Sequence, residues 1–434
     1  MRSYIQLELR SLLASRSLWV LLFLTGPLVG YSFIQAVSLY GEASRPALVT
    51  PQMAAGLNPF DGVIIPTYGS LYLTLTLLFP FVAIRMISGD KDSGALHLLL
   101  QTPVRPGALL ASKVVMLSFA LFLVELPGFL ALFHWRLSGG HIYAPETLCL
   151  LFGHFLYGLL VIAISLFAAT VSETASTAAL LALACTLGSW VLDFAASGNS
   201  WLVKFSGLSL TAALKPFEQG LLQWNVIVRI VIAAAGLFAL TLIWWHPGRS
   251  LRVKFSWSAA VLLACIVLHP VSHFLTRSSD LTEDQRHSFS PTVSAALRQI
   301  HEPVRVTLYL APEDPRLMDF DHSILAKLRR VLPRTEIVNR EASQALLFKT
   351  GEDPNYGLIV YEIGARRAES RSTSPEEVLP LLWNLAAIAP PASDNPVAYP
   401  GYPLVVESSG RAEFIFNVLW PALCFAGWFL FSRR

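Results

Sequence analysis

The sequence predicts a mainly α-helical polytopic membrane protein, with about eight transmembrane helices and an extracytoplasmic α/β domain between the last two of them. Three observations support this fold class. Of the 434 residues, 54% are hydrophobic and 14% are charged, whereas soluble proteins average about 25% charged residues. Long apolar segments recur along the chain. Residues 277–413 instead carry 15 Lys and Arg against 19 Asp and Glu, while the remainder carries 17 against 10.

Eight apolar segments are long enough to cross the hydrocarbon core as helices, which takes about 20 residues. They are residues 17–39, 65–87, 109–133, 147–170, 176–196, 225–245, 257–275 and 414–431. Several contain Gly or Pro, which membrane helices tolerate. The first segment is too long for the apolar part of a secretory signal, and no clear cleavage site follows it. All four cysteines fall inside apolar segments, so neither a disulfide framework nor a zinc site is expected.

The distribution of Lys and Arg in the short connections predicts the orientation, because cytoplasmic loops carry the excess of positive charge. With the N-terminus inside, twelve of these residues are cytoplasmic and four are outside. We therefore expect a multi-pass protein of the bacterial cytoplasmic (inner) membrane with both termini in the cytoplasm. The acidic segment, residues 276–413, is then extracytoplasmic.

These boundaries give the predicted domain organisation. Residues 1–16 form an amphipathic interfacial helix, and residues 17–245 form a six-span domain. Residues 246–275 are a basic cytoplasmic loop and the seventh span, residues 276–413 the outer domain, and residues 414–434 the last span with a basic tail. In the outer domain we expect strands at 304–311, 335–340 and 357–363, helices at 322–333 and 375–387, and a Pro-rich tether at 389–403.

A short segment between the second and third spans, ISGDKDSGALHLLLQTPV at residues 87–104, has an unusual composition. Asp92 or Ser93 can cap a helix that runs to Gln101 and is too short to span the membrane. Its four leucines, each worth roughly 1.5–3 kcal/mol when buried, need a cover of lipid, of the protein itself or of a cytoplasmic partner. In the last case a force on the helix tilts the two adjoining spans, whereas a helix resting on the bilayer or on its own bundle has no such role.

Residues 85–115 resemble the cytoplasmic loop of the permease subunits of type-2 ABC exporters, most closely in the gliding-motility and nitrous-oxide-reductase-maturation branch. Residues 8–33 and 208–240 are similar to other parts of the same family, with Phe217 and Gly220 in the expected places, and Lys113 matches the usual basic residue at the start of the third span. The resemblance implies that the loop contacts an ATPase subunit. The residues that carry the resemblance are Asp90, Lys91, Asp92, Gly94, Leu96, Leu98, Leu99, Thr102, Pro103 and Val104, and of these we expect Asp90, Asp92, Gly94, Leu96, Leu98, Leu99, Thr102 and Pro103 to contact the ATPase.

A second resemblance concerns residues 278–312, which look like the start of the auxiliary extracytoplasmic subunit of gliding-motility ABC systems. The shared pattern is D-L-T-x-D-x-R-x-S-x-S, carried here by Asp280, Leu281, Thr282, Asp284, Arg286, Ser288 and Ser290. Such subunits end in a second membrane helix, as this chain does at 414–431. The resemblance implies a permease fused to a shortened auxiliary domain.

Motifs that would make the chain an enzyme are missing from the sequence. No G-x-x-x-x-G-K-[ST] loop is present, so any ATP and Mg²⁺ must be held by a partner ATPase subunit, and we expect no directly bound cofactor or metal and no nucleic acid. No G-x-S-x-G or H-E-x-x-H motif occurs. His269 and His273 have a spacing that could hold a metal, but Pro270 and the lack of a third ligand favour interfacial histidines.

Ionisable residues inside spans are costly and are candidates for function. Glu125 could line a translocation path, or it could be a polar residue that packs between helices near the outer interface; His154, a second candidate for the path, and Asp193 are weaker examples of the same case. Glu173, in the cytoplasmic turn VSETAS, could form a second contact with an ATPase or simply be solvated.

These features together predict a permease subunit of an ATP-binding-cassette exporter. It would work with a separate ATPase subunit and with a second copy or a paralogue, in contact with membrane lipid, and its outer domain could contact an envelope partner. The alternatives are a membrane-anchored scaffold that presents the outer domain, which makes no demand on the loop, and an intramembrane enzyme, which needs Glu125 and His154 to face one cavity.

Overall fold

The computed structural model describes residues 2–102, 104–196, 209–246, 248–272, 274–275, 277–311, 314–332, 334–340, 355–391 and 399–432. The chain divides into two compact units, which are described separately. One unit comprises Met1–Ser279 and Pro400–Arg434, and the other comprises Asp280–Tyr399.

The first unit is helical, and the prediction of eight spans is confirmed. Eight helices in the described chain are long and apolar enough to cross a membrane: Arg16–Val49, Phe60–Asp92, Pro106–Leu137, Ala144–Val171, Ala175–Leu192, Trp224–Trp245, Leu251–Ser272 and Gly410–Phe431. The first span continues to Val49, well beyond the predicted end at residue 39. Residues 40–49 are only moderately apolar, so their helix is an extension that hydropathy does not require.

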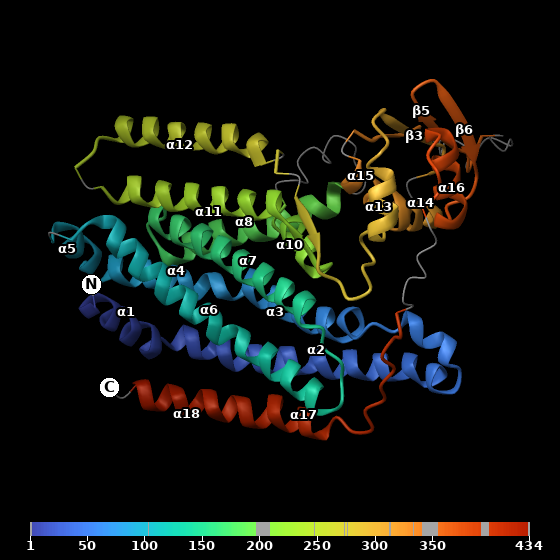
Figure 1. Cartoon of the computed structure of the whole chain (residues 1–434). Helices are drawn as coiled ribbons and strands as arrows, with labels where there is room; N and C mark the ends of the chain where they lie inside the picture. The colour runs from blue at the N-terminus through green and yellow to red at the C-terminus, as the bar shows by residue number, and fades with distance from the viewer. Residues whose placement is uncertain are drawn as a thin grey trace, which may run out of the picture. The chain divides into compact units, whose positions relative to one another are not determined.

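The elements of this unit follow one another with short connections. They are α1 (Arg2–Ala14), α2 (Arg16–Val49), η1 (Pro51–Gly56), η2 (Phe60–Ile64), α3 (Ile65–Leu77), α4 (Phe79–Asp92), α5 (Ala95–Gln101), α6 (Pro106–Leu137), α7 (Ala144–Val171), α8 (Ala175–Ala196), α10 (Leu210–Glu218), β1 (Leu221–Gln223), α11 (Trp224–Trp245), α12 (Leu251–Ser272), β2 (Ser278–Asp280), α17 (Gly410–Phe414), η5 (Ile415–Leu419) and α18 (Trp420–Ser432). Both chain termini and α5 lie at the same end of the helical unit (Figure 1).

The second span is interrupted between α3 and α4. Pro80 has no N–H, so the carbonyl of Thr76 loses its normal partner within the helix. The hydroxyl of Thr186, on α8, donates to that carbonyl at 3.2 Å. Tyr157 of α7 and the Thr76 hydroxyl lie 2.7 Å apart. Neighbouring helices thus satisfy the freed backbone group, as membrane proteins require.

Helix α10 precedes the sixth span and contains or adjoins Phe217 and Gly220, the two residues that match the family resemblance there. Phe217 is fully buried, and its ring packs where Gly153 of α7 leaves room; a Cβ at Gly153 would lie 2.4 Å from the Cβ of Phe217. Gly220 has φ +68°, which lets the chain turn from α10 into β1. Both residues therefore serve the joint between α10 and the sixth span.

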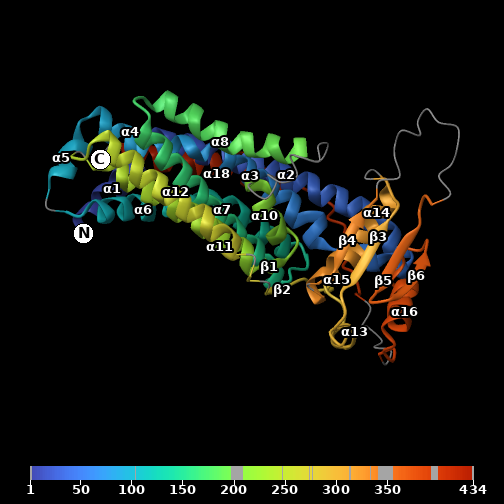
Figure 2. The same ribbon diagram turned by 90° about the horizontal axis from the view of Figure 1, so that it is seen from above.

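The last two spans pack on different helices. Helix α12 lies along α11, where the Sγ of Cys265 sits against Gly236 (Figures 1 and 2). Helix α18 packs on α2 instead. There Trp420 occupies the space over Gly26, and its indole N–H donates to the Leu22 carbonyl at 2.7 Å. Phe416 packs over Gly30 in the same way, so large side chains of the last span fill small positions of the first.

The segment that leads into the last span is held on the helical unit. Tyr402 stacks on His141 with ring centroids 3.6 Å apart, and its carbonyl accepts from the Tyr40 hydroxyl at 2.8 Å. Leu404 N–H donates to the Ser44 hydroxyl at 3.1 Å. Of the Pro-rich stretch expected as a tether, residues 389–391 and 399–403 are described, and these contacts fix its end.

The second unit is a two-layer α/β domain. Its sheet has the order β4-β3-β5-β6, with β3 and β4 parallel and the other pairs antiparallel. The strands are β3 (Val304–Leu308), β4 (Glu336–Asn339), β5 (Ile359–Ile363) and β6 (Arg366–Ser370). The helices are α13 (Pro291–Leu297), α14 (Pro315–Phe320), η3 (Asp321–Leu325), α15 (Ala326–Val331) and α16 (Pro375–Ala386). Alternate residues of β3 and β5 enter one apolar core with these helices.

The three strands and both helices expected in the outer domain are present. The first helix is longer than expected, because it begins at Pro315 where Asp314 accepts from the Arg316 N–H. Strand β6, with the sequence RRAES, was not predicted. It is a polar edge strand, so it lacks the apolar alternation that identifies strands with a buried face.

The D-L-T-x-D-x-R-x-S-x-S pattern forms a loop organised around one carboxylate. Asp280 Oδ1 accepts from the N–H and the hydroxyl of Thr282, at 3.1 and 2.6 Å. Its Oδ2 accepts from the His287 N–H at 3.0 Å and the Ser288 hydroxyl at 2.9 Å. Ser290 caps α13. Most of the pattern thus has a structural role within its own loop.

The contact between α18 and α2 gives a first prediction. A Cβ at Gly26 would lie 2.0 Å from Cδ1 of Trp420, whereas a Cβ at Gly69 meets no atom within 4 Å. Gly26→Ala should therefore destabilise the protein by about 1–3 kcal/mol through overpacking. Gly69→Ala, the matched control in another span, should gain the roughly 0.5–1 kcal/mol that Ala contributes in a helix. The measurement is the thermal unfolding midpoint of both variants in one detergent. Equal midpoints for the two variants would contradict this packing.

Candidate functional site

The loop between the second and third spans forms the predicted short helix with a different start. Helix α4 ends at Asp92, Gly94 turns the chain with φ +73°, and α5 follows as Ala95–Gln101. The expected cap by Asp92 or Ser93 is wrong: the N-cap residue is Gly94. The Ser93 hydroxyl instead donates back to the Gly89 carbonyl at 2.8 Å. A tight turn that needs a left-handed residue has replaced the side-chain cap.

The leucines of α5 do not share one environment. Leu96 is 7% exposed and packs within its own chain, so it is already covered. Leu98 is 66% exposed, and Leu99 and Leu100 are half-buried. The Thr102 hydroxyl donates to the Leu99 carbonyl at 2.6 Å where the helix ends. Asp92 and Gly94 are exposed, and Pro103 lies outside the described residues.

A buried charge cluster joins this loop to two other helices. Lys113 of α6 is 1% exposed, and its Nζ donates to Glu8 Oε1 of α1 at 2.8 Å and to Asp90 Oδ2 of α4 at 2.5 Å. A third bond, of 3.0 Å, goes to the Met86 carbonyl. All three donors of the ammonium are therefore used. Because a buried ammonium needs full compensation, the cluster holds α1, α4 and α6 together.

Lys91, the residue after Asp90, connects α4 to the end of α7. Lys91 Nζ donates to the carbonyls of Ala169, Thr170 and Ser172 at 2.6, 2.7 and 3.0 Å. Ala169 and Thr170 lie in the last turn of α7 and Ser172 is its C-cap, so these carbonyls have no partner within the helix and lie at its negative dipole end. The turn that they begin contains Glu173, whose side chain is exposed. The structure thus brings the two predicted ATPase contacts to one end of the unit and links their backbones through Lys91.

Glu8 is the member of this site that the sequence analysis missed. It lies four residues before Leu12, which is 1% exposed, so both residues occupy the buried face of α1. An acidic residue on the apolar face of a short helix was the available signal, because such a residue requires a cationic partner.

A second group of polar residues lies inside the spans. His154 Nδ1 of α7 is 3.7 Å from Glu125 Oε1 of α6, and the His154 ring meets Tyr68 of α3 edge-on with centroids 5.3 Å apart. All three side chains are buried. Neither Glu125 oxygen, neither His154 nitrogen, nor the Tyr68 hydroxyl has a hydrogen-bond partner in the described chain. The structure therefore brings together two residues that were chosen separately, and it adds Tyr68.

This intramembrane cluster has limited chemistry of its own. Because isolated charges are costly at such depth, the Glu125–His154 pair is most stable when it carries no net charge. Within the described residues no group of three or more His, Cys, Asp or Glu could hold a metal. His273 and the side chain of Asp193 lie outside the described part of the chain, so the His269–His273 pair is not described.

Removing the cation of the charge cluster should be costly. Lys113→Met leaves Glu8 and Asp90 facing each other without compensation, and breaking a buried pair in this way costs about 3–5 kcal/mol. Adding Glu8→Gln should recover most of the loss, because Asp90 is partly exposed and can be solvated. Arg85→Met, which removes an exposed cation, should change the free energy of unfolding by less than about 0.5 kcal/mol. A Lys113→Met midpoint as high as that of Arg85→Met would refute the bracing role of the cluster.

Removing the Glu125–His154 pair, unlike removing Lys113, should not destabilise the protein. Since neither polar group has a close hydrogen bond, replacing both in Glu125→Met/His154→Leu should keep the stability or raise it by about 1–4 kcal/mol. The single variant His154→Leu should be less stable than the double, because it leaves Glu125 alone. Unfolding midpoints in detergent measure both. A double variant less stable than either single variant would show that the pair holds the helices together.

Comparison with known proteins identifies the family of the helical unit. Residues 4–267, more than half of the chain, match the family model described as ABC-2 family transporter protein. No curated protein and no solved structure matches the chain. The match covers the charge cluster, α5 and the intramembrane pair, and it includes the seventh span only in part. The chain belongs to the ABC-2 transporter family, whose members are the multi-pass membrane components of ABC transporters and normally work with an ATPase subunit.

Proposed function

We propose that this chain is an exporter permease whose α5 docks a separate nucleotide-binding subunit, which hydrolyses ATP and holds the Mg²⁺. The observation that carries the proposal is the exposure of Leu98 on a helix whose base is held by Asp90 and Lys91. A helix that is anchored at its start by Asp90 and Lys91 and that exposes Leu98 can transmit force from a partner to the spans. The scaffold alternative requires neither.

The site residues divide by their accessibility. Leu98 and the half-buried Leu99 can reach a partner, as can Asp92. Leu96 cannot do so without leaving its own core, so its role in coupling is to fix α5. Glu173 lies beside the Lys91 contact and offers the partner a second, acidic point of attachment. Movement of the partner would then act on α4 and α7 together.

The remaining parts of the proposal follow from the topology. Two permease bodies, from two copies or from a paralogue, would pair with two ATPase subunits in the bacterial inner membrane, with both termini in the cytoplasm. The outer unit, Asp280–Tyr399, would contact an envelope partner, consistent with the gliding-motility-like pattern. Glu125 and His154 would line the path or sense its opening, because their unused hydrogen-bonding groups can accept a polar guest. An enzymatic role is not favoured, since the family members are transport subunits rather than catalysts.

The docking role of α5 can be tested within α5 itself. Leu98→Asp should leave expression and the unfolding midpoint unchanged, because the side chain is exposed. It should weaken association with the ATPase subunit about 10- to 100-fold, since burying one leucine contributes roughly 1.5–3 kcal/mol. Leu96→Asp should instead lower the midpoint.

Co-purification and stimulation of the ATPase measure the first effect. If Leu98→Asp associates and stimulates as well as the unchanged protein, α5 is not the docking helix.

Transport by the Glu125→Gln variant distinguishes a role in lining the path from a role in packing. Unchanged transport would assign Glu125 to packing alone.

A further inference from the structure

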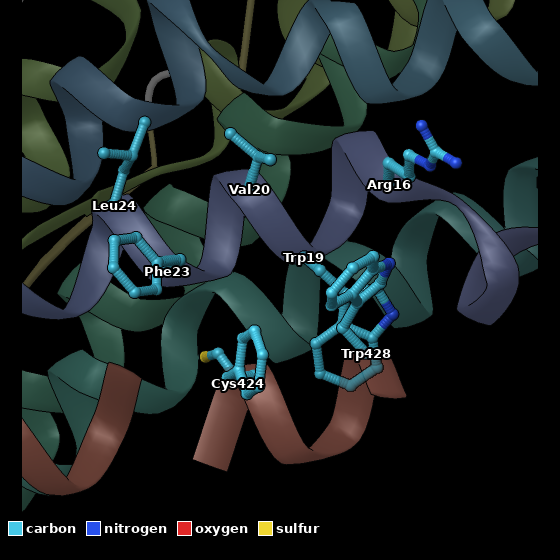
Figure 3. A pocket seen from close by; sticks show the side chains of 8 residues that line it. Arg16, Trp19, Val20, Phe23, Leu24, Cys424 and Trp428 are labelled. Carbon is cyan, nitrogen blue, oxygen red and sulfur yellow. The ribbon is translucent and has the colours of Figure 1, made fainter. Parts of the chain in front are cut away.

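An apolar groove lies between the first and the last span. It has a volume of about 280 Å³. Its lining residues are Arg16, Trp19, Val20, Phe23, Leu24, Cys424, Phe425 and Trp428 (Figure 3). No acidic residue is among them, and Arg16 is the only charged one.

Two close helix contacts bracket the groove. At one end Trp19 packs over Gly427, where a Cβ would lie 2.3 Å from its ring, and at the other end Trp420 packs over Gly26. The Trp19 N–H donates to the Leu13 carbonyl at 2.6 Å, so this wall is fixed to the end of α1. Between the two contacts Val20 and Phe425 are 58% and 62% exposed. The helices are therefore held at a constant spacing with an open apolar surface between them.

The groove has one polar end. The Arg16 side chain is exposed, and its guanidinium has no hydrogen bond or ion pair with any part of the chain that the structure describes. In Figure 3 it lies at the same end as Trp19 and Trp428, while Leu24 lies at the other end. Arg and Trp are residues that membrane proteins place at the level of the lipid headgroups. The groove thus combines an apolar trough with an unpaired cation at the position of a headgroup.

We propose that this groove binds one anionic glycerophospholipid, with an acyl chain along Val20, Phe23 and Phe425 and its phosphate on Arg16. A purely apolar guest would leave the guanidinium without a counter-ion, whereas a phosphate can accept two parallel N–H bonds from it. A zwitterionic lipid brings its own cation, which competes with Arg16. The groove requires α18, which lies outside the residues that match the family model. The proposal does not depend on the docking of an ATPase.

The test uses the full chain, purified in detergent and stripped of lipid. Native mass spectrometry measures the binding of phosphatidylglycerol and phosphatidylcholine with identical acyl chains. We expect about a five-fold preference for phosphatidylglycerol, the factor that one basic residue contributes at an anionic surface. Arg16→Gln should abolish the preference, and Arg16→Lys should keep it. Arg85→Gln, which removes an exposed arginine that does not line the groove, should also keep it.

A variant that fills the groove provides an independent measurement. Val20→Trp places a large ring in the trough and should abolish the specific binding of both lipids, because the ring and an acyl chain cannot occupy the same space. The proposal is overturned if the unchanged protein shows no preference, or if Arg16→Gln retains it. It is also overturned if Arg85→Gln loses the preference equally, or if Val20→Trp binds lipid normally.

Discussion

The buried ammonium of Lys113 is the interaction on which the end of the helical unit that carries α5 depends. A cation that is 1% exposed can persist there only because Glu8, Asp90 and the Met86 carbonyl use all three of its protons. These partners come from α1 and α4, so satisfying one charge fixes three helices. Asp90 lies in the last turn of α4, directly before the turn at Ser93 and Gly94 that leads into α5. The compensation of one buried charge therefore fixes the end of α4 from which α5 begins.

The sequence predicted the features that follow from the environment that one type of residue requires, such as lipid for a long apolar segment. The eight spans follow from hydrophobicity alone, and Glu125 and His154 were identified because charges inside spans are costly. Pairwise geometry was not accessible in this way. Nothing in the sequence indicated that Glu125 and His154 lie 3.7 Å apart, or that Glu8 meets Lys113, which is 105 residues away in the chain. Strand β6 was missed because an edge strand has no buried face to set its pattern.

The leucines of α5 are the same residue type but lie in different environments in the structure. The four leucines of the short helix were expected to need a cover of lipid, of the protein itself or of a partner, and the structure divides them: Leu96 is covered by the chain itself while Leu98 is exposed. Leu99 and Leu100, three and four residues after Leu96, lie on its side of the helix and are half-buried, whereas Leu98, two residues after it, faces away. The helix is thus attached through one side chain and accessible through another. That division of labour is what allows a stable element to remain open to a partner.

Two contact routes lead from the loop to the two helices that flank the unit Asp280–Tyr399 in sequence. Lys91 binds the end of α7, α7 packs on α11, and α11 packs on α12. Asp90 binds Lys113 of α6, α6 packs on α2, and α2 packs on α18 through the glycine contacts. A displacement of α5 that moved α6 and α7 by different amounts would change the spacing of α12 and α18. Because those two helices precede and follow the unit Asp280–Tyr399 in the chain, a force received by α5 under the proposed function would reach both ends of that unit.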